Sequence, residues 1–244
     1  PISEYKTHRS PLPNHYQWRR SMSLPGVTVA ASVVIMDWLN IEDGLRCLEG
    51  EKTDFLHFDI MDGYFVADFT MGSVVVESIR QGSSIAAEFH AMVEEPRRVF
   101  SCFTPREAEV FMIHYEASRN LHRDIVTLRK LGFRPGVVLN PQTPLESVEY
   151  VLGELHRVTI LATHPGFDDH IMASETIEKV KILQEWKNRS NSLLNIAIDG
   201  GYTIDAVSDL ASAGANHFVV GSSTQVKEAG SLQAAVRAVR IAAS

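Results

Sequence analysis

Disulfide chemistry has little basis in this chain, because only two of its 244 residues are cysteine. Cys47 and Cys102 lie in segments with helical patterns and lack C-x-x-C spacing, so neither a disulfide framework nor a thiolate zinc site is predicted. No apolar run approaches the roughly 18 residues that a membrane span needs, and the first residues do not resemble a signal peptide. We therefore expect a cytoplasmic protein without membrane contact.

A surplus of basic residues is also absent. The sequence has 23 Lys and Arg against 30 Asp and Glu, which gives a formal net charge of -7. Proteins that bind nucleic acids need clustered cations to neutralise phosphates, so no nucleic-acid partner is expected. An enzyme with an anionic substrate would then need local positive features.

The chain divides into a short arm and one domain. Residues 1–25 are polar, contain several prolines and show no helical or strand periodicity, which predicts an N-terminal arm. Residues 26–244 have the composition of a globular protein and the length of a single barrel domain.

Short β-branched or apolar runs alternate with longer amphipathic segments after residue 26, which indicates repeated strand-helix units. Eight runs are predicted as strands, at 27–34, 55–60, 84–89, 109–115, 134–139, 157–161, 194–198 and 217–220. Gly132 stands where a helix would end, just before the fifth run. A doubly wound sheet is the alternative, but the first strand-helix turn lacks its GxGxxG fingerprint. The sequence thus predicts an α/β protein with a single (β/α)8 TIM barrel.

Polar residues at the carboxyl ends of the predicted strands point to a site, because TIM barrels carry their active sites at that end. In LHFDIMDG, strand alternation directs His57 and Asp59 into the barrel. His90 ends the third strand and Asp199 ends the seventh. Each residue alone is compatible with a hydrogen-bonded core position or a turn, but together the four predict one divalent metal site.

Several motifs in the same order resemble the ribulose-phosphate 3-epimerase family. The most specific is LHFDIMDGYFVADFTMG, and EFHAMVEEP, VVLNPQTPLE, HPGF, IDGG and VGSS follow it. The resemblance extends from about Val29 to Ser223. It implies that His57, Asp59, His90 and Asp199 bind the metal.

The resemblance also implies that Asp59 and Asp199 are the catalytic acid and base. A hard cation that chelates two neighbouring substrate oxygens would stabilise an enediolate, while the two carboxylates move a proton on opposite faces of carbon three. Zinc, iron(II), manganese and cobalt all suit mixed nitrogen and oxygen ligands.

Further positions are implied as substrate contacts. Ser32 matches a family serine near the substrate, and Met61 and Met92 match methionines that cap the reacting carbons. The family holds the substrate phosphate on backbone N–H groups of glycine loops, which implies phosphate contacts at Gly166, Gly200, Gly201, Gly221 and Ser222. His114 matches a family position without an evident chemical partner and is assigned to structure, and Asn140 before a proline predicts a turn.

One loop departs from the family. Where the family has NPGFGGQ, this chain has HPGFDDH, so Asp168 and Asp169 replace two glycines. Two carboxylates near a phosphate repel it, which predicts that the loop after strand six binds phosphate differently from the family loop. Leu161 also replaces a third capping methionine.

The sequence therefore predicts a metal-dependent 3-epimerase of a ketose phosphate of the ribulose 5-phosphate type, expected to be a homo-oligomer. An epimerase for a different or unphosphorylated ketose and a non-catalytic sugar-phosphate-binding barrel remain alternatives. A lyase or decarboxylase on a related barrel is a third, but DIMDG lacks the lysine expected near the second-strand aspartate.

Overall fold

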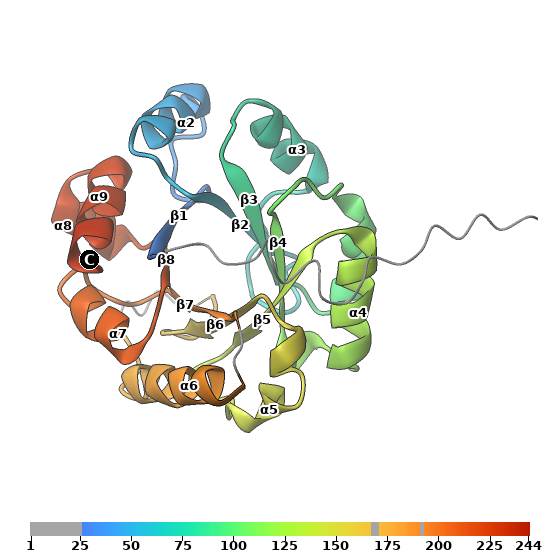
Figure 1. Cartoon of the computed structure of the whole chain (residues 1–244). Helices are drawn as coiled ribbons and strands as arrows, with labels where there is room; N and C mark the ends of the chain where they lie inside the picture. Colours follow the sequence, from blue (N-terminus) through green and yellow to red (C-terminus); the bar gives the residue numbers. More distant parts are fainter. Residues whose placement is uncertain (1–25, 167–170, 191–192) are drawn as a thin grey trace, which may run out of the picture.

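The computed structural model describes residues 26–166, 171–190 and 193–244. Within these ranges eight parallel strands close into a ring, and helices surround it (Figure 1). The strands are β1 (Thr28–Ser32), β2 (Phe55–Met61), β3 (Ala86–Met92), β4 (Val110–His114), β5 (Arg134–Leu139), β6 (Arg157–Leu161), β7 (Asn195–Asp199) and β8 (His217–Val220). The predicted arm at 1–25 lies outside the described residues and stays a prediction.

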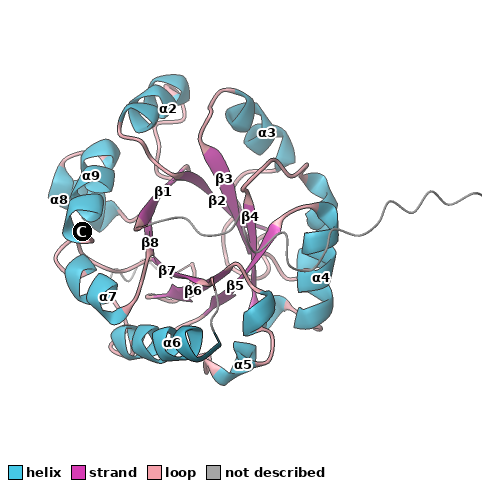
Figure 2. Ribbon diagram, viewed as in Figure 1, coloured by secondary structure: helices cyan, strands magenta, loops and turns pink. Residues whose placement is uncertain are grey.

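The helices follow the strands along the chain and cover the outside of the ring, as Figure 2 shows. The α-helices are α2 (Ile41–Gly50), α3 (Ser73–Gln81), α4 (Leu121–Leu131), α5 (Glu146–Glu149), α6 (Thr176–Ser190), α7 (Val207–Ala213), α8 (Ser223–Ala229) and α9 (Leu232–Ala242). Short 3-10 turns are η1 (Pro96–Arg98), η2 (Phe100–Cys102), η3 (Tyr115–Ala117) and η4 (Leu152–Glu154). None of the described helices is both long and apolar enough to cross a membrane.

Strands β1 and β8 close the barrel. They pair in parallel, with Thr28 opposite His217 and Ala31 opposite Val220. An open doubly wound sheet has two edge strands, whereas each strand here pairs with two neighbours in chain order, so that alternative is excluded and the predicted TIM barrel is confirmed. All eight predicted strands are present, although β3 continues past His90 to Met92.

Strand alternation divides the core into two layers. Leu56, Phe58 and Ile60 belong to the large apolar cluster between the strands and the helices. Phe55 belongs to a smaller cluster that includes Met112 and Leu161 from other strands. The two sides of β2 thus have separate partners, which leaves His57 and Asp59 on the inner face.

The connection between β3 and β4 differs from the expected pattern. Cys102 was expected in a helical segment, but only the short turns η1 and η2 form there. Phe100 packs on Phe111, and Phe103 packs on Phe89, with ring centroids 5.5 and 4.9 Å apart. These aromatic contacts cover the strands in place of a helix. By contrast, Gly132 ends α4 in the left-handed conformation, as predicted.

Candidate active site

The register between β2 and β3 brings their inward side chains together. Three cross-strand pairs point to the barrel interior: His57 with Glu88, Asp59 with His90, and Met61 with Met92. Because side chains two residues apart share one face of a strand, the pairs form successive layers toward the carboxyl end. Asp199 is the last residue of β7 and completes the group from another strand.

The four predicted ligand residues converge. Nε2 of His57 lies 3.1 Å from Oδ1 of Asp59 and 3.5 Å from Oδ2 of Asp199. Nδ1 of His90 lies 3.2 and 3.3 Å from the same two oxygens. Both imidazole rings are buried, whereas the Asp59 and Asp199 side chains retain 15% and 13% of their exposure. The cluster is therefore reachable from solvent on its carboxylate side.

The electrostatics of the cluster favour a cation. Burial lowers the pKa of His57, but the charges of Asp59 and Asp199 outweigh it and raise that pKa well above its usual value. The pKa of His90 is also raised, since its hydrogen bonds to Asp199 and Asp59 outweigh the effect of burial. Burial would raise the pKa of Asp59, but the charge of His57 and its hydrogen bond to the carboxylate hold that pKa below its usual value. Asp59 thus stays ionised and attracts positive charge.

The donor set fits a divalent metal. Two imidazole nitrogens and two carboxylate oxygens, one from each residue, lie within 4.8 Å of one another. Ligand atoms at the corners of a tetrahedron, each about 2.0 Å from the centre, are about 3.3 Å apart. The four nitrogen-oxygen distances in the cluster, 3.1 to 3.5 Å, are close to this value. A mixed nitrogen and oxygen set suits zinc, iron(II), manganese or cobalt.

Ser32 lies beside the cluster. Its buried hydroxyl donates to Oδ2 of Asp59 at 2.9 Å, so Asp59 contacts the histidines with one oxygen and Ser32 with the other. Met92 is buried and Met61 is half-buried next to it in register. Substrate contact by these three residues stays a prediction.

The glycines predicted to bind phosphate lie in tight loops after β6, β7 and β8. Gly166, Gly200 and Gly201 have positive φ values of 75°, 75° and 63°. A Cβ on Gly201 would lie 2.0 Å from the Thr163 side chain, so only glycine fits there. The β6 and β7 loops therefore pack closely against each other.

The backbone N–H groups of Gly221 and Ser222, which follow β8, were expected to bind phosphate but have a partner within the chain. The N–H groups of Gly221 and Ser222 both donate to Oε1 of Gln225, each at 3.1 Å. Gln225 is fully buried, and its Nε2 donates to the carbonyl oxygen of Tyr202 at 3.2 Å. Two of the groups predicted to hold phosphate thus already have an acceptor within the chain. The S-x-x-Q capping-box pattern of SSTQ was the sequence signal for this contact.

Two residues behind the cluster contact its histidines, although the sequence predicted no such contact for either. Nε2 of His114 lies 2.9 Å from Nε2 of His90, so the interpretation that His114 has no chemical partner is wrong. Oε1 of Glu88 lies 2.6 Å from Nδ1 of His57. The EFH spacing could have identified Glu88, since it lies on the same strand face as His90.

Two further predictions concern the loops after β5 and β6. Asn140 does lie in a turn, where its carbonyl oxygen accepts the N–H of Thr143 at 3.0 Å. Asp168 and Asp169 lie outside the described residues, so altered phosphate binding by the loop after β6 stays a prediction.

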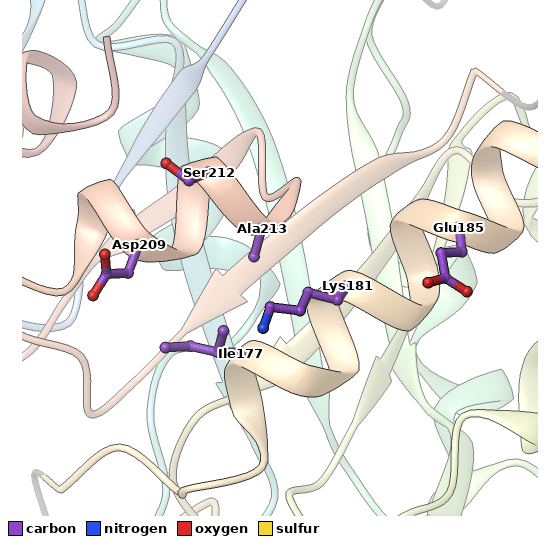
Figure 3. Close-up of a pocket in the computed structure, with 6 residues that line it drawn as sticks. All are labelled: Ile177, Lys181, Glu185, Asp209, Ser212 and Ala213. Carbon is purple, nitrogen blue, oxygen red and sulfur yellow. The ribbon is translucent and has the colours of Figure 1, made fainter.

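A cavity of about 550 Å³ lies elsewhere, on the outer face between α6 and α7 (Figure 3). Its lining consists of Ile177, Lys181, Glu185, Asp209, Ser212 and Ala213. None of the residues predicted for the site is among them. The four-residue cluster inside the barrel is therefore the better candidate for chemistry.

Comparison with solved structures supports the fold alone. The tryptophan synthase subunit alpha from Legionella pneumophila str. Paris superposes with a TM-score of 0.53 and 12% sequence identity, covering 89% of this chain and 92% of that chain.

Sequence comparison is more specific. The ribulose-phosphate 3-epimerase of Bacillus subtilis (strain 168) is 32% identical over 197 residues, covering 80% of this chain and 91% of that protein. The enzyme of the same name from Escherichia coli (strain K12) is 30% identical over 196 residues, covering 80% and 87%. The sequence model described as Ribulose-phosphate 3 epimerase family matches residues 28–224. The chain therefore belongs to the ribulose-phosphate 3-epimerase family and, as predicted, to the isomerases.

Proposed function

We propose that the protein is a metal-dependent 3-epimerase of a ketose phosphate of the ribulose 5-phosphate type. The observation that carries the proposal is the convergence of two imidazoles and two carboxylates within 4.8 Å at the carboxyl end of the barrel strands. Family membership supports the reaction class, and the names of the similar enzymes supply the substrate type.

The metal would be held by His57, Asp59, His90 and Asp199. When bound there, a divalent ion supplies positive charge that stabilises the negative charge developing on substrate oxygens as the carbon-bound proton leaves. The protein contributes a rigid and partly desolvated site, because both histidines are buried between strands.

Proton transfer falls to the two carboxylates. Asp59 and Asp199 each direct one oxygen at the histidines. The second oxygen of each would exchange the proton with the substrate, and that of Asp59 has a second lone pair for it beside the hydrogen bond from Ser32. One carboxylate removes the proton from carbon three and the other delivers a proton to the opposite face, which inverts the centre. Ser32 holds Oδ2 of Asp59 in place through its hydroxyl. No organic cofactor is needed for this reaction.

A second candidate is an epimerase that acts on a ketose without a phosphate. The contact that favours it is the acceptor Oε1 of Gln225, which occupies the N–H groups of Gly221 and Ser222. The same carboxylates would perform the same proton transfer, and only the recognition of the distal end of the substrate would differ.

Solvent deuterium exchange tests the proposal. The protein is incubated with ribulose 5-phosphate in D2O, and deuterium at carbon three is followed by proton NMR, with metal-stripped protein as the control. Metal content is measured on the same sample. A protein without stoichiometric divalent metal and without exchange into any ketose phosphate would contradict the proposal. Exchange into ribulose but not into its phosphate would favour the second candidate.

A further inference from the structure

Glu88 lies in the barrel interior, below the candidate metal site, and joins three basic side chains. Its Oε1 lies 2.6 Å from Nδ1 of His57, and its Oε2 lies 3.1 Å from Nε2 of His217 and pairs with the Arg157 guanidinium. All four side chains are fully buried. A carboxylate in this position is not a solvated surface charge, and its contacts are fixed by three strands.

The contact with His57 determines which nitrogen of that ring faces the cluster. An ionised carboxylate accepts hydrogen bonds and cannot donate one, so Nδ1 of His57 donates its N–H to Glu88. Because Nδ1 keeps its proton for Glu88, Nε2 is the nitrogen that would release its proton and offer its electron pair to a metal. That atom is the one directed at Asp59 and Asp199, at 3.1 and 3.5 Å.

The other contacts hold Glu88 itself. Arg157 compensates its charge and lies with the guanidinium carbon 5.2 Å from the centre of the Phe55 ring. His217 is fixed from its far side by Thr28, whose hydroxyl lies 2.7 Å from Nδ1. Because both partners are fully buried and contact Glu88 from two sides, rotation of Glu88 away from His57 would break two buried charged contacts.

We propose that Glu88 is a positioning residue for the candidate metal site, which orients His57 and fixes its Nε2 as the ligand atom. The inference rests on the proposed function, since it assumes that the cluster binds a metal. Carboxylates behind metal-binding histidines have this role in general, and their loss typically weakens metal binding about 10- to 100-fold.

Zinc(II) affinity tests the inference without turnover. The dissociation constant is measured by competition with a chromophoric chelator for the wild type, Glu88→Gln and Glu109→Gln. Glu109 is the matched control, because it is buried and pairs with buried Arg80 but does not contact the cluster. We expect zinc to bind Glu88→Gln about 10- to 100-fold more weakly than the wild type, and Glu109→Gln with wild-type affinity.

Two outcomes separate the inference from the proposed function. A wild-type protein that binds no zinc would overturn the metal site, and the inference with it. Wild-type affinity in Glu88→Gln, or an equal loss in Glu109→Gln, would overturn the positioning role alone.

A measurement on the wild type keeps the inference testable if Glu88→Gln does not fold. Long-range nitrogen-proton NMR of the zinc-loaded protein reports which ring nitrogen of each histidine carries a proton. We expect a protonated Nδ1 and an unprotonated Nε2 for His57. The reverse tautomer would overturn the inference.

Discussion

Nε2 of His90 lies 2.9 Å from Nε2 of His114, so one imidazole must donate an N–H and the other must accept it. The direction follows from the next contact, because Nδ1 of His114 lies 3.2 Å from Oε2 of Glu116 and donates to that carboxylate. His114 then accepts from His90. Nδ1 of His90 is therefore the nitrogen that faces Asp59 and Asp199, and it would offer its electron pair to a metal on release of its proton.

Replacing His114 with Phe should therefore destabilise the metal-free protein. The ring volume is retained, but the N–H of His90 loses its acceptor in a buried place, which costs about 1–3 kcal/mol. Chemical denaturation measures the change in unfolding free energy. His122→Phe is the control, because His122 is exposed and forms a surface ion pair with Glu154. Equal stability of the two variants would contradict the assigned hydrogen bond.

Asp199→Asn should remove proton transfer while leaving the barrel folded. The amide cannot accept a carbon-bound proton and offers the cluster no negative charge, so exchange at carbon three should fall by about 10²- to 10⁴-fold. Deuterium uptake and circular dichroism together separate lost chemistry from lost structure. Asp205→Asn, an exposed residue in the following segment, is the matched control. Unchanged exchange in Asp199→Asn would refute the two-carboxylate assignment.

The strands and the four cluster residues could be predicted because each depends on local information. Alternating apolar residues identify a strand and its inner face, and the last inward residues of a barrel strand lie at its mouth. His57 and Asp59 follow from this rule alone, and their convergence with His90 and Asp199 follows once the strands close into a ring.

The strand face of Glu88 is local information, but the partners of the residues behind the cluster depend on the register between strands, which the sequence does not specify. Glu88 reaches His57 only because β2 and β3 pair with these two residues opposite each other. Arg157 contacts Glu88 across 69 positions of sequence. Arg157 is the first residue of β6, a position where an arginine side chain is usually solvated. Its burial becomes evident only in the closed barrel.

Gln225→Ala should improve the binding of phosphorylated substrates. The change frees the N–H groups of Gly221 and Ser222 from Oε1 of Gln225, so both become available to an anion. We expect a lower KM for ribulose 5-phosphate. Ser231→Ala is the control, because it removes a comparable cap from α9 and should cost about 1 kcal/mol of stability without changing KM. An unchanged KM in Gln225→Ala would indicate that these amides do not limit phosphate binding.

Acid should destabilise the protein through His156, which lies at the amino-terminal end of the barrel. Burial, together with the charges of Arg157 and Arg134, holds the pKa of this imidazole well below its usual value of 6.5. The folded protein keeps His156 neutral at a pH where the unfolded chain already binds a proton. Since the unfolded state binds more protons, stability falls as pH decreases from 6.5 toward the lowered folded pKa.

His156→Gln isolates this contribution. Glutamine retains an acceptor for the side chain of Asn195, which contacts Nε2 of His156 at 3.3 Å, but it does not titrate. Below pH 6.5, the unfolding free energy of the wild type should fall more steeply than that of the variant, by up to about 1.4 kcal/mol per pH unit. Denaturation in urea at several pH values measures both slopes, with His122→Gln as an exposed control. Parallel slopes for wild type and His156→Gln would show that His156 takes up its proton equally in the folded and unfolded states.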